Sequence, residues 1–328
     1  MWIFGKEYMM AIFYSALGQT FYLILLILIG FLLTKLRILS ADAAKILATL
    51  ENWVFIPALM LKTFMTDFTV DRLAQSGSVF LFSAAMLIPV VPMAILISKG
   101  LTRDAFTRNI FTYGLAFSNF GYMGISVVEA VFPQYAGDYL VFTMPLYILI
   151  YLWGVPTLLM KEEKTSFLQN LKSLLNPMFI GMFLGMIVGL VTSVLPEMTI
   201  PAPLLPPLNA IDNVITALKS CMSPVAMLLT GVTVANIDFK KTFSNVKIYA
   251  ITAIRLVAIP LLFLAAFKWI PMPETFFVCL IAALAMPLGL NTVVVPSAYG
   301  KDVSIAAGMA LVSHILSCIT IPLIFLLM

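Results

Sequence analysis

Charged residues are scarce in this chain. Only 10% of its 328 residues are Asp, Glu, Lys or Arg, whereas 62% are hydrophobic. In a soluble domain roughly a quarter of the residues are charged, so the composition excludes an ordinary soluble enzyme or binding module. The formal net charge of +4 comes from basic residues that are spread among short loops. They form no patch with interleaved aromatic residues, so we expect no nucleic-acid partner.

Histidine and cysteine are rare as well. The sequence has one His and three Cys, and Cys221, Cys279 and Cys318 all lie in apolar segments. Because it contains no CxxC pair and no Cys/His spacing typical of a metal site, we expect neither a metal nor another cofactor. The motifs HExxH and GxSxG and phosphate-binding glycine loops are missing too. These absences argue against an enzyme, including an intramembrane hydrolase, and no charged or carbonyl filter motif indicates a channel.

Long apolar runs are what the chain has in abundance. Ten stretches approach the ~20 residues that a helix needs to cross a bilayer. The sequence therefore predicts an all-α polytopic membrane protein with ten transmembrane helices. The predicted spans are Ile12–Leu33, Ala44–Phe64, Gly77–Ser98, Phe106–Phe132, Leu140–Met160, Pro177–Leu195, Ile211–Ala235, Ile248–Phe267, Phe276–Ser297 and Ile305–Leu327.

Lysine and arginine are distributed unevenly across this topology. Of the 19, thirteen lie in or near the loops after odd-numbered spans, four lie in or near those on the opposite side, and Lys219 and Arg255 lie deeper within spans. Positively charged loops stay in the cytoplasm. We therefore predict a multi-pass protein of the cell (plasma) membrane with both termini extracytoplasmic. The thirteen are Lys35, Arg37, Lys45, Lys99, Arg103, Arg108, Lys161, Lys164, Lys172, Lys240, Lys241, Lys247 and Lys301, and the four are Lys6, Lys62, Arg72 and Lys268.

The two halves of the chain share a pattern of prolines. Pro57 and Pro224 are 167 residues apart, and Pro156 and Pro322 are 166 residues apart. Five spans followed by five spans have opposite topologies because five is odd, and inverted repeats are a transporter signature. The sequence predicts a first five-helix repeat at 1–160, a cytoplasmic linker at 161–176 and a second, inverted repeat at 177–328.

Spans four and nine contain polar and helix-breaking residues where a lipid-exposed helix should be continuous. A proline removes a backbone donor, and an opened backbone in lipid must find partners in protein or in a water-filled cavity. Broken helices of this kind form midplane binding sites in transporters, and half-helix N-termini favour anions. The predicted substrate-binding residues are Ser118, Asn119, Gly121, Tyr122, Pro287, Gly289, Asn291 and Thr292.

Three ionisable residues inside the predicted spans are candidates for coupling transport to an ion. His314 lies near the midplane of span ten, where we expect either a proton-coupling role or a structural one. Arg255 in span eight either pairs with a substrate carboxylate or extends toward the membrane surface. Glu51 in span two lies at a depth related by the repeat to that of Lys219 but in the opposite leaflet, which favours a scaffold or interface role over an ion pair.

Short motifs occur at Asn119–Gly124, Asn176-Pro177, Ser223–Val232, Pro287 with Asn291, Tyr299-Gly300 and Leu316–Pro322. Together they resemble the auxin efflux carrier family of transporters. They lie in the same order along nearly the whole chain. In plant auxin carriers the first break contains an Asn-Pro pair, whereas Asn119 is followed here by Phe120, so this break depends on Gly121 and Gly124. The long cytoplasmic loop of many plant members is also missing, and both departures argue against auxin as the substrate.

The resemblance implies an elevator-type carrier of a small organic anion, because bacterial relatives include malate and malonate permeases. It implies a 5+5 inverted repeat in which helices 4 and 9 are broken and cross. Helices 1, 2, 6 and 7 would form a scaffold, helices 3–5 and 8–10 a transport domain, and the scaffold a homodimer interface. A sodium-coupled carrier of the bile-acid type and a transport-dead sensor on the same fold are the alternatives.

Overall fold

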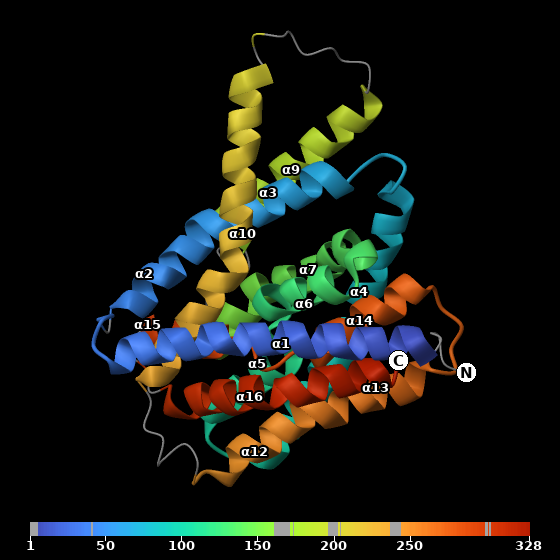
Figure 1. Cartoon of the computed structure of the whole chain (residues 1–328). Coiled ribbons are helices and arrows are strands. Elements are labelled where there is room, and N and C mark those ends of the chain that lie inside the picture. The colour runs from blue at the N-terminus through green and yellow to red at the C-terminus, as the bar shows by residue number, and fades with distance from the viewer. Residues whose placement is uncertain are drawn as a thin grey trace.

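The computed structural model describes residues 6–40, 42–160, 171–172, 174–195, 203, 205–236, 244–298, 301 and 303–328. All regular elements in these ranges are helices. The predicted linker lies largely, and the Tyr299-Gly300 pair entirely, outside the described residues. Figure 1 shows a bundle of long helices in which α1 (Lys6–Lys35) runs beside α16 (Ser304–Leu326).

Eight helices of the described chain are long and apolar enough to cross a membrane, which confirms a multi-pass membrane protein. Their ends agree with those of eight predicted spans to within seven residues. They are α1; α2 (Ala43–Leu50) with η1 (Glu51–Phe55) and α3 (Ile56–Asp67); α4 (Leu73–Leu101); η3 (Pro133–Tyr135) with α7 (Ala136–Leu149) and η4 (Ile150–Met160); α9 (Pro177–Val194); α10 (Leu205–Ala235); α12 (Val246–Ala253) with η6 (Ile254–Ala258) and α13 (Ile259–Phe267); and α16.

The other two predicted spans are interrupted. In the first, α5 (Ala105–Ala116) is followed by η2 (Phe120–Gly124) and α6 (Ile125–Val131). In the second, α14 (Glu274–Ala285) is separated from α15 (Asn291–Ala298) by a non-helical segment. Both predicted breaks are therefore present, and this is why neither span counts among the eight continuous helices.

Prolines explain where the continuous helices widen. The π-helical segments η1 and η6 are followed by Pro57 and Pro260, and η4 contains Pro156. A proline inside a helix lacks its N–H and clashes with the preceding turn. A wider π turn relieves that clash without ending the helix. Pro57 and Pro156 of the repeated pattern thus accompany widened turns, whereas their counterparts Pro224 and Pro322 lie inside the α-helices α10 and α16.

Glycines allow two pairs of helices to pack very closely. A Cβ at Gly181, Gly185 or Gly189 of α9 would lie 2.6 Å from a carbonyl oxygen of α3 or of Phe68 just after it. Gly30 of α1 and Gly231 of α10 face each other's helix backbones in the same way. Small residues at such spacing are what allow membrane helices to associate, because dispersion contacts replace the hydrophobic effect in lipid. Helices α1, α3, α9 and α10 are held together by these contacts.

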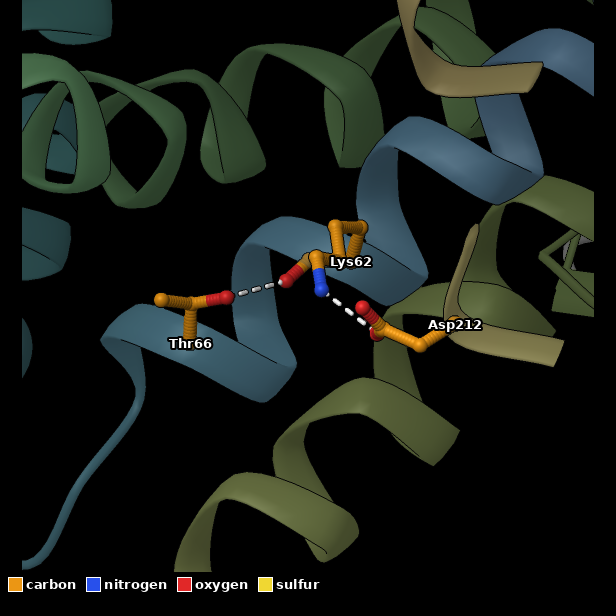
Figure 2. Close-up of polar contacts among 3 residues, drawn as sticks. All are labelled: Lys62, Thr66 and Asp212. Carbon is orange, nitrogen blue, oxygen red and sulfur yellow. Dashed lines mark hydrogen bonds and ion pairs between the residues drawn. The ribbon is translucent and has the colours of Figure 1, made fainter. Parts of the chain in front are cut away.

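Ion pairs connect helices at partly exposed positions. Lys62 Nζ of α3 lies 2.5 Å from Asp212 Oδ1 of α10, as Figure 2 shows. Lys219 Nζ of α10 lies 3.1 Å from Glu129 Oε1 of α6. Exposed pairs of this kind contribute at most about 1 kcal/mol. The two pairs show where the charges of Lys62 and Lys219 are bound, and neither lysine faces a buried site.

Candidate functional site

The two breaks cross and pair with each other through the backbone. Ser118 and Leu288 form an isolated antiparallel bridge, and Asn119 N–H donates to the Pro287 carbonyl at 2.7 Å. Pro287 has no N–H to satisfy, so its carbonyl is the only polar backbone group it leaves open. Leu288 N–H donates to Ser313 Oγ of α16 at 3.3 Å. The opened backbone is thus satisfied inside the protein, as the membrane interior requires.

Gly289 permits this close crossing. A Cβ at that position would lie 3.0 Å from the Phe117 carbonyl oxygen and 3.2 Å from that of Ser118. Both neighbours are backbone atoms that are fixed by the crossing, so they have little freedom to withdraw. Glycine is required here for close approach of two chains, which is a positioning role rather than direct binding.

The two half-helix N-termini are not equivalent. At η2 the first backbone bonds of the helix run from the N–H groups of Met123 and Gly124 to the Asn119 carbonyl. The N–H groups of the residues between Asn119 and Met123 therefore have no carbonyl of this helix to donate to. At α15 the N–H groups of Thr292 and Val293 already donate to the carbonyls of Gly289 and Leu290. The sequence predicted two similar ends, whereas the first N–H groups at α15 donate within a short turn and those at η2 precede the first bond of the helix.

Asn119 is connected to the lone histidine. Its Nδ2 lies 2.9 Å from His314 Nε2, and His314 Nδ1 lies 2.7 Å from the Ala310 carbonyl. A carbonyl only accepts, so Nδ1 carries the proton and Nε2 accepts from Asn119. Asn119 Oδ1 is buried and has no hydrogen-bond partner among the described residues. His314 therefore fixes the orientation of the Asn119 amide.

Arg255 donates hydrogen bonds to the C-terminal ends of α5 and α14, the helices that precede the two breaks. Its Nε donates to the Met286 carbonyl at 3.2 Å, Nη1 to the Leu115 carbonyl at 2.9 Å and Nη2 to the Ala283 carbonyl at 3.1 Å. It is 1% exposed. A cation at these ends complements the negative end of each helix dipole. The structure thus places the buried Arg255 side chain on backbone carbonyls through three of its five N–H groups, and Arg255 is not among the residues that line the cavity at the crossing.

A cavity of about 40 Å³ lies at the crossing. It brings together most of the predicted binding residues, with Asn119, Gly121 and Tyr122 on one break and Gly289 and Asn291 on the other. Ser118 also lines it, although its Oγ donates to the Ala283 carbonyl at 2.7 Å. Of the predicted residues, Pro287 and Thr292 are not among those that line it. They shape the break instead, since Thr292 Oγ1 donates to the Gly289 carbonyl at 2.8 Å.

Tyrosines on neighbouring helices complete the cavity, and the sequence reasoning missed them. Tyr147 and Tyr151 come from α7 and η4, and Tyr113 of α5 accepts from Asn291 Nδ2 at 3.1 Å. Tyr147 and Tyr151 are four residues apart, the spacing that puts two side chains on one helix face, so a signal was present. Asn52, Ile56 and Met178 close the opposite wall; the full lining adds Phe120, Ile150 and Leu290.

A larger cavity of about 420 Å³ lies among α13, α14 and the end of α16. Its walls are apolar apart from Lys268. Binding sites combine an apolar surface with a few convergent polar groups, and those converge at the crossing. The smaller cavity is therefore the candidate site.

The profile of a protein family described as membrane transport protein matches residues 15–325. The chain belongs to the auxin efflux carrier family. No curated protein matches it at a significant level. Membership makes this carrier a membrane transporter, and its matched region includes both breaks and the cavity between them.

The donors at the crossing give this carrier a site suited to a negative charge. Asn119 and Asn291 each use Nδ2 within the protein, but an amide nitrogen has two N–H groups and retains one. The Tyr113 hydroxyl accepts from Asn291, which leaves its own hydrogen available to a ligand. Among the described residues that line the cavity there is no Lys or Arg. A bound anion would be held by N–H and O–H dipoles.

Proposed function

We propose that this protein is an elevator-type secondary transporter of a small organic anion, most simply a carboxylate. The observation that carries the proposal is the pair of crossing breaks around a cavity lined by amide, hydroxyl and backbone N–H donors. Such donors stabilise an anion in a low-dielectric site without a cationic side chain. The family supports transport, and the site supports the anion.

The chain divides, in this proposal, into two inverted five-helix repeats at 1–160 and 177–328, joined by a cytoplasmic linker. The closely packed helices α1, α3, α9 and α10 belong to the scaffold, whereas both breaks belong to the transport domain. Asn52, Ile56 and Met178 supply the scaffold wall of the cavity. At about 40 Å³ the cavity is far smaller than the ~300 Å³ or more of a typical ligand pocket, so the two domains must separate to admit a substrate.

Counterflow in proteoliposomes tests this function. Vesicles that contain the purified protein and are loaded with an unlabelled monocarboxylate or dicarboxylate are expected to accumulate the same labelled compound, whereas protein-free vesicles are not. A panel of monocarboxylates, dicarboxylates and indole acids identifies the substrate, with and without sodium. Stimulation by sodium alone would favour a bile-acid-type symporter. Ligand-induced stabilisation without counterflow would favour a sensor.

Orientation in the membrane yields a second prediction. Single cysteines placed at Ser166 and Gln134, in a variant that lacks the three native cysteines, are expected to react with a membrane-impermeant thiol reagent from opposite sides of intact cells. Ser166 lies in the predicted cytoplasmic linker, outside the described residues, and should react only after permeabilisation. Labelling of both positions from outside would contradict the inverted topology. Cross-linking of intact membranes in the same cells would test the proposed scaffold homodimer.

A further inference from the structure

Glu51 is a carboxylic acid buried in the membrane-spanning part of the protein. It begins η1, the widened turn of the second span, and is 0% exposed. Neither Oε1 nor Oε2 has a hydrogen-bond partner among the described residues. An ionised carboxylate in such a place would lose its hydration without compensation from a cation or a hydrogen-bond donor. The neutral acid is the form that this environment accommodates.

Glu51 also lies directly behind the candidate site. Its chain neighbour Asn52 and Ile56, one turn later, line the cavity, whereas Glu51 is not among the lining residues. Tyr122 and Tyr147 line the same cavity as Asn52 and Ile56. Opening of this cavity would therefore take place one residue along the chain from Glu51.

The charged groups on the surrounding helices are engaged elsewhere. Helix η1 packs against α2, α3, α9 and α10. Lys62 of α3 pairs with Asp212 of α10, Lys219 of α10 pairs with Glu129, and Asp67 of α3 pairs with Arg72 at 3.7 Å. The remaining titratable groups on these helices are Lys45 of α2, which is exposed, and Cys221 of α10, and α9 carries none. No cation in the described chain neutralises Glu51.

We propose that Glu51 binds the proton that couples closure of the site to pH, an inference that rests on the proposed function. The Glu51 carboxylate takes up one proton to become a carboxylic acid before the cavity lined by Asn52, Tyr122 and Tyr147 closes. It releases that proton to water when the cavity opens. The closed, substrate-holding state therefore contains one more proton than the open state.

His314 is less suited to this role. Both of its ring nitrogens are occupied in the neutral form, by the Ala310 carbonyl and by Asn119. A second proton on Nε2 would break the hydrogen bond from the Asn119 amide, and that bond would have to form again when the proton is released. Glu51 needs no bond to be broken when it gains or loses its proton. The histidine is the orienting partner of Asn119, and the glutamate is the proton site.

Infrared spectroscopy tests the proton directly and requires no substrate. At neutral pH the wild-type protein is expected to show the carbonyl stretch of a protonated carboxylic acid, and Glu51→Gln is expected to lack it. Glu129→Gln is the matched control and should retain the band, because Glu129 is paired with Lys219. Should Glu51→Gln fail to fold, Glu51→Met serves the same comparison. Absence of the band from the wild type, or its persistence without Glu51, overturns the proposal.

The pH dependence of affinity tests the coupling. Over a range in which the ligand carboxylate stays ionised, wild-type affinity is expected to weaken as pH rises, by up to about tenfold per pH unit for one proton. Affinity falls as pH rises because closure requires the neutral Glu51 carboxylic acid. In the open state the fraction of Glu51 in this form decreases as pH rises above the ordinary pKa of a glutamate. Glu51→Gln, which mimics the neutral form, should remove this slope, whereas Glu7→Gln at an exposed position should keep it.

A slope that persists in Glu51→Gln, or that disappears only in His314→Gln, overturns the assignment to Glu51. A wild-type affinity that is independent of pH overturns the coupling itself. If the wild-type protein binds no carboxylate at all, the proposed function fails while the infrared result still decides whether Glu51 carries a proton.

Discussion

Replacement of Arg255 by methionine is expected to destabilise the protein by about 3–5 kcal/mol or more. The guanidinium donates to the carbonyls of Leu115, Ala283 and Met286, which end the first half-helices of both breaks. A hydrogen bond from a charged donor contributes about 1.5–3 kcal/mol. Methionine matches the aliphatic part of the arginine side chain but has no donor, so three backbone acceptors would be left in a dry interior.

Thermal unfolding in detergent measures this effect. Arg255→Lys is the informative companion, because it keeps the charge but replaces a planar fork by a single ammonium group. We expect it to recover only part of the lost stability, since one nitrogen cannot reach three carbonyls on two helices. Arg103→Met, at an exposed loop position, should change the unfolding temperature little. An Arg255→Met protein as stable as the wild type would show that the two breaks keep their structure without the hydrogen bonds from Arg255.

The hydrogen-bond partners of Arg255 could not be predicted from the sequence. Arg255 stands inside an apolar span, so its importance was visible, but both roles assigned to it assumed that it faced a ligand or the membrane surface. A residue near position 255 reaches carbonyls at 115, 283 and 286 only because three separate helices converge. Long-range convergence of this kind leaves no local trace in a sequence, since a carbonyl acceptor is present at every position.

Local chemistry, by contrast, made the breaks predictable. Pro287, Gly289 and the glycines after Asn119 stand in apolar segments where lipid penalises an open backbone, and both segments are interrupted as expected. The bounds of the eight continuous helices were likewise set by the length of apolar runs. What the pattern lacked was the pairing between breaks, because antiparallel contact between Ser118 and Leu288 depends on the crossing geometry.

The candidate site was therefore predicted in part. Asn119 and Asn291 were identified from their polarity, and the cavity brings them together. Tyr113, Tyr147 and Tyr151 were not, because a tyrosine in a membrane span is commonly an interface anchor and its hydroxyl becomes functional only when a partner is nearby. His314 was recognised as unusual, but its partnership with Asn119 across 195 residues appears only in three dimensions.

Removal of either amide at the crossing is expected to weaken binding of the transported carboxylate by roughly ten- to hundredfold. The substitutions are Asn119→Ala and Asn291→Ala. Each amide nitrogen retains one N–H beyond its bond to His314 or Tyr113. A hydrogen bond to a charged group contributes about 1.5–3 kcal/mol, and 1.4 kcal/mol corresponds to a factor of ten in affinity.

The two variants should differ in the stability of the empty protein. Asn119→Ala leaves His314 Nε2 buried without its donor, which costs about 1–3 kcal/mol. Asn291→Ala leaves only the Tyr113 hydroxyl without its hydrogen-bond partner. This hydroxyl lines the cavity and can turn toward it, so we expect a smaller loss of stability. Thermal unfolding with and without ligand separates the two effects, because a ligand raises apparent stability only as far as it binds.

Asn236→Ala is the matched control, since this exposed amide donates to the Val232 carbonyl at the end of α10, far along the chain from either break. It should leave affinity unchanged. If both crossing variants bind a confirmed substrate as tightly as the wild type, the breaks act as hinges and the amides only support them. The anion would then be held by the hydroxyls of Tyr147 and Tyr151 on the facing helix, and substitution of those tyrosines by phenylalanine would carry the loss instead.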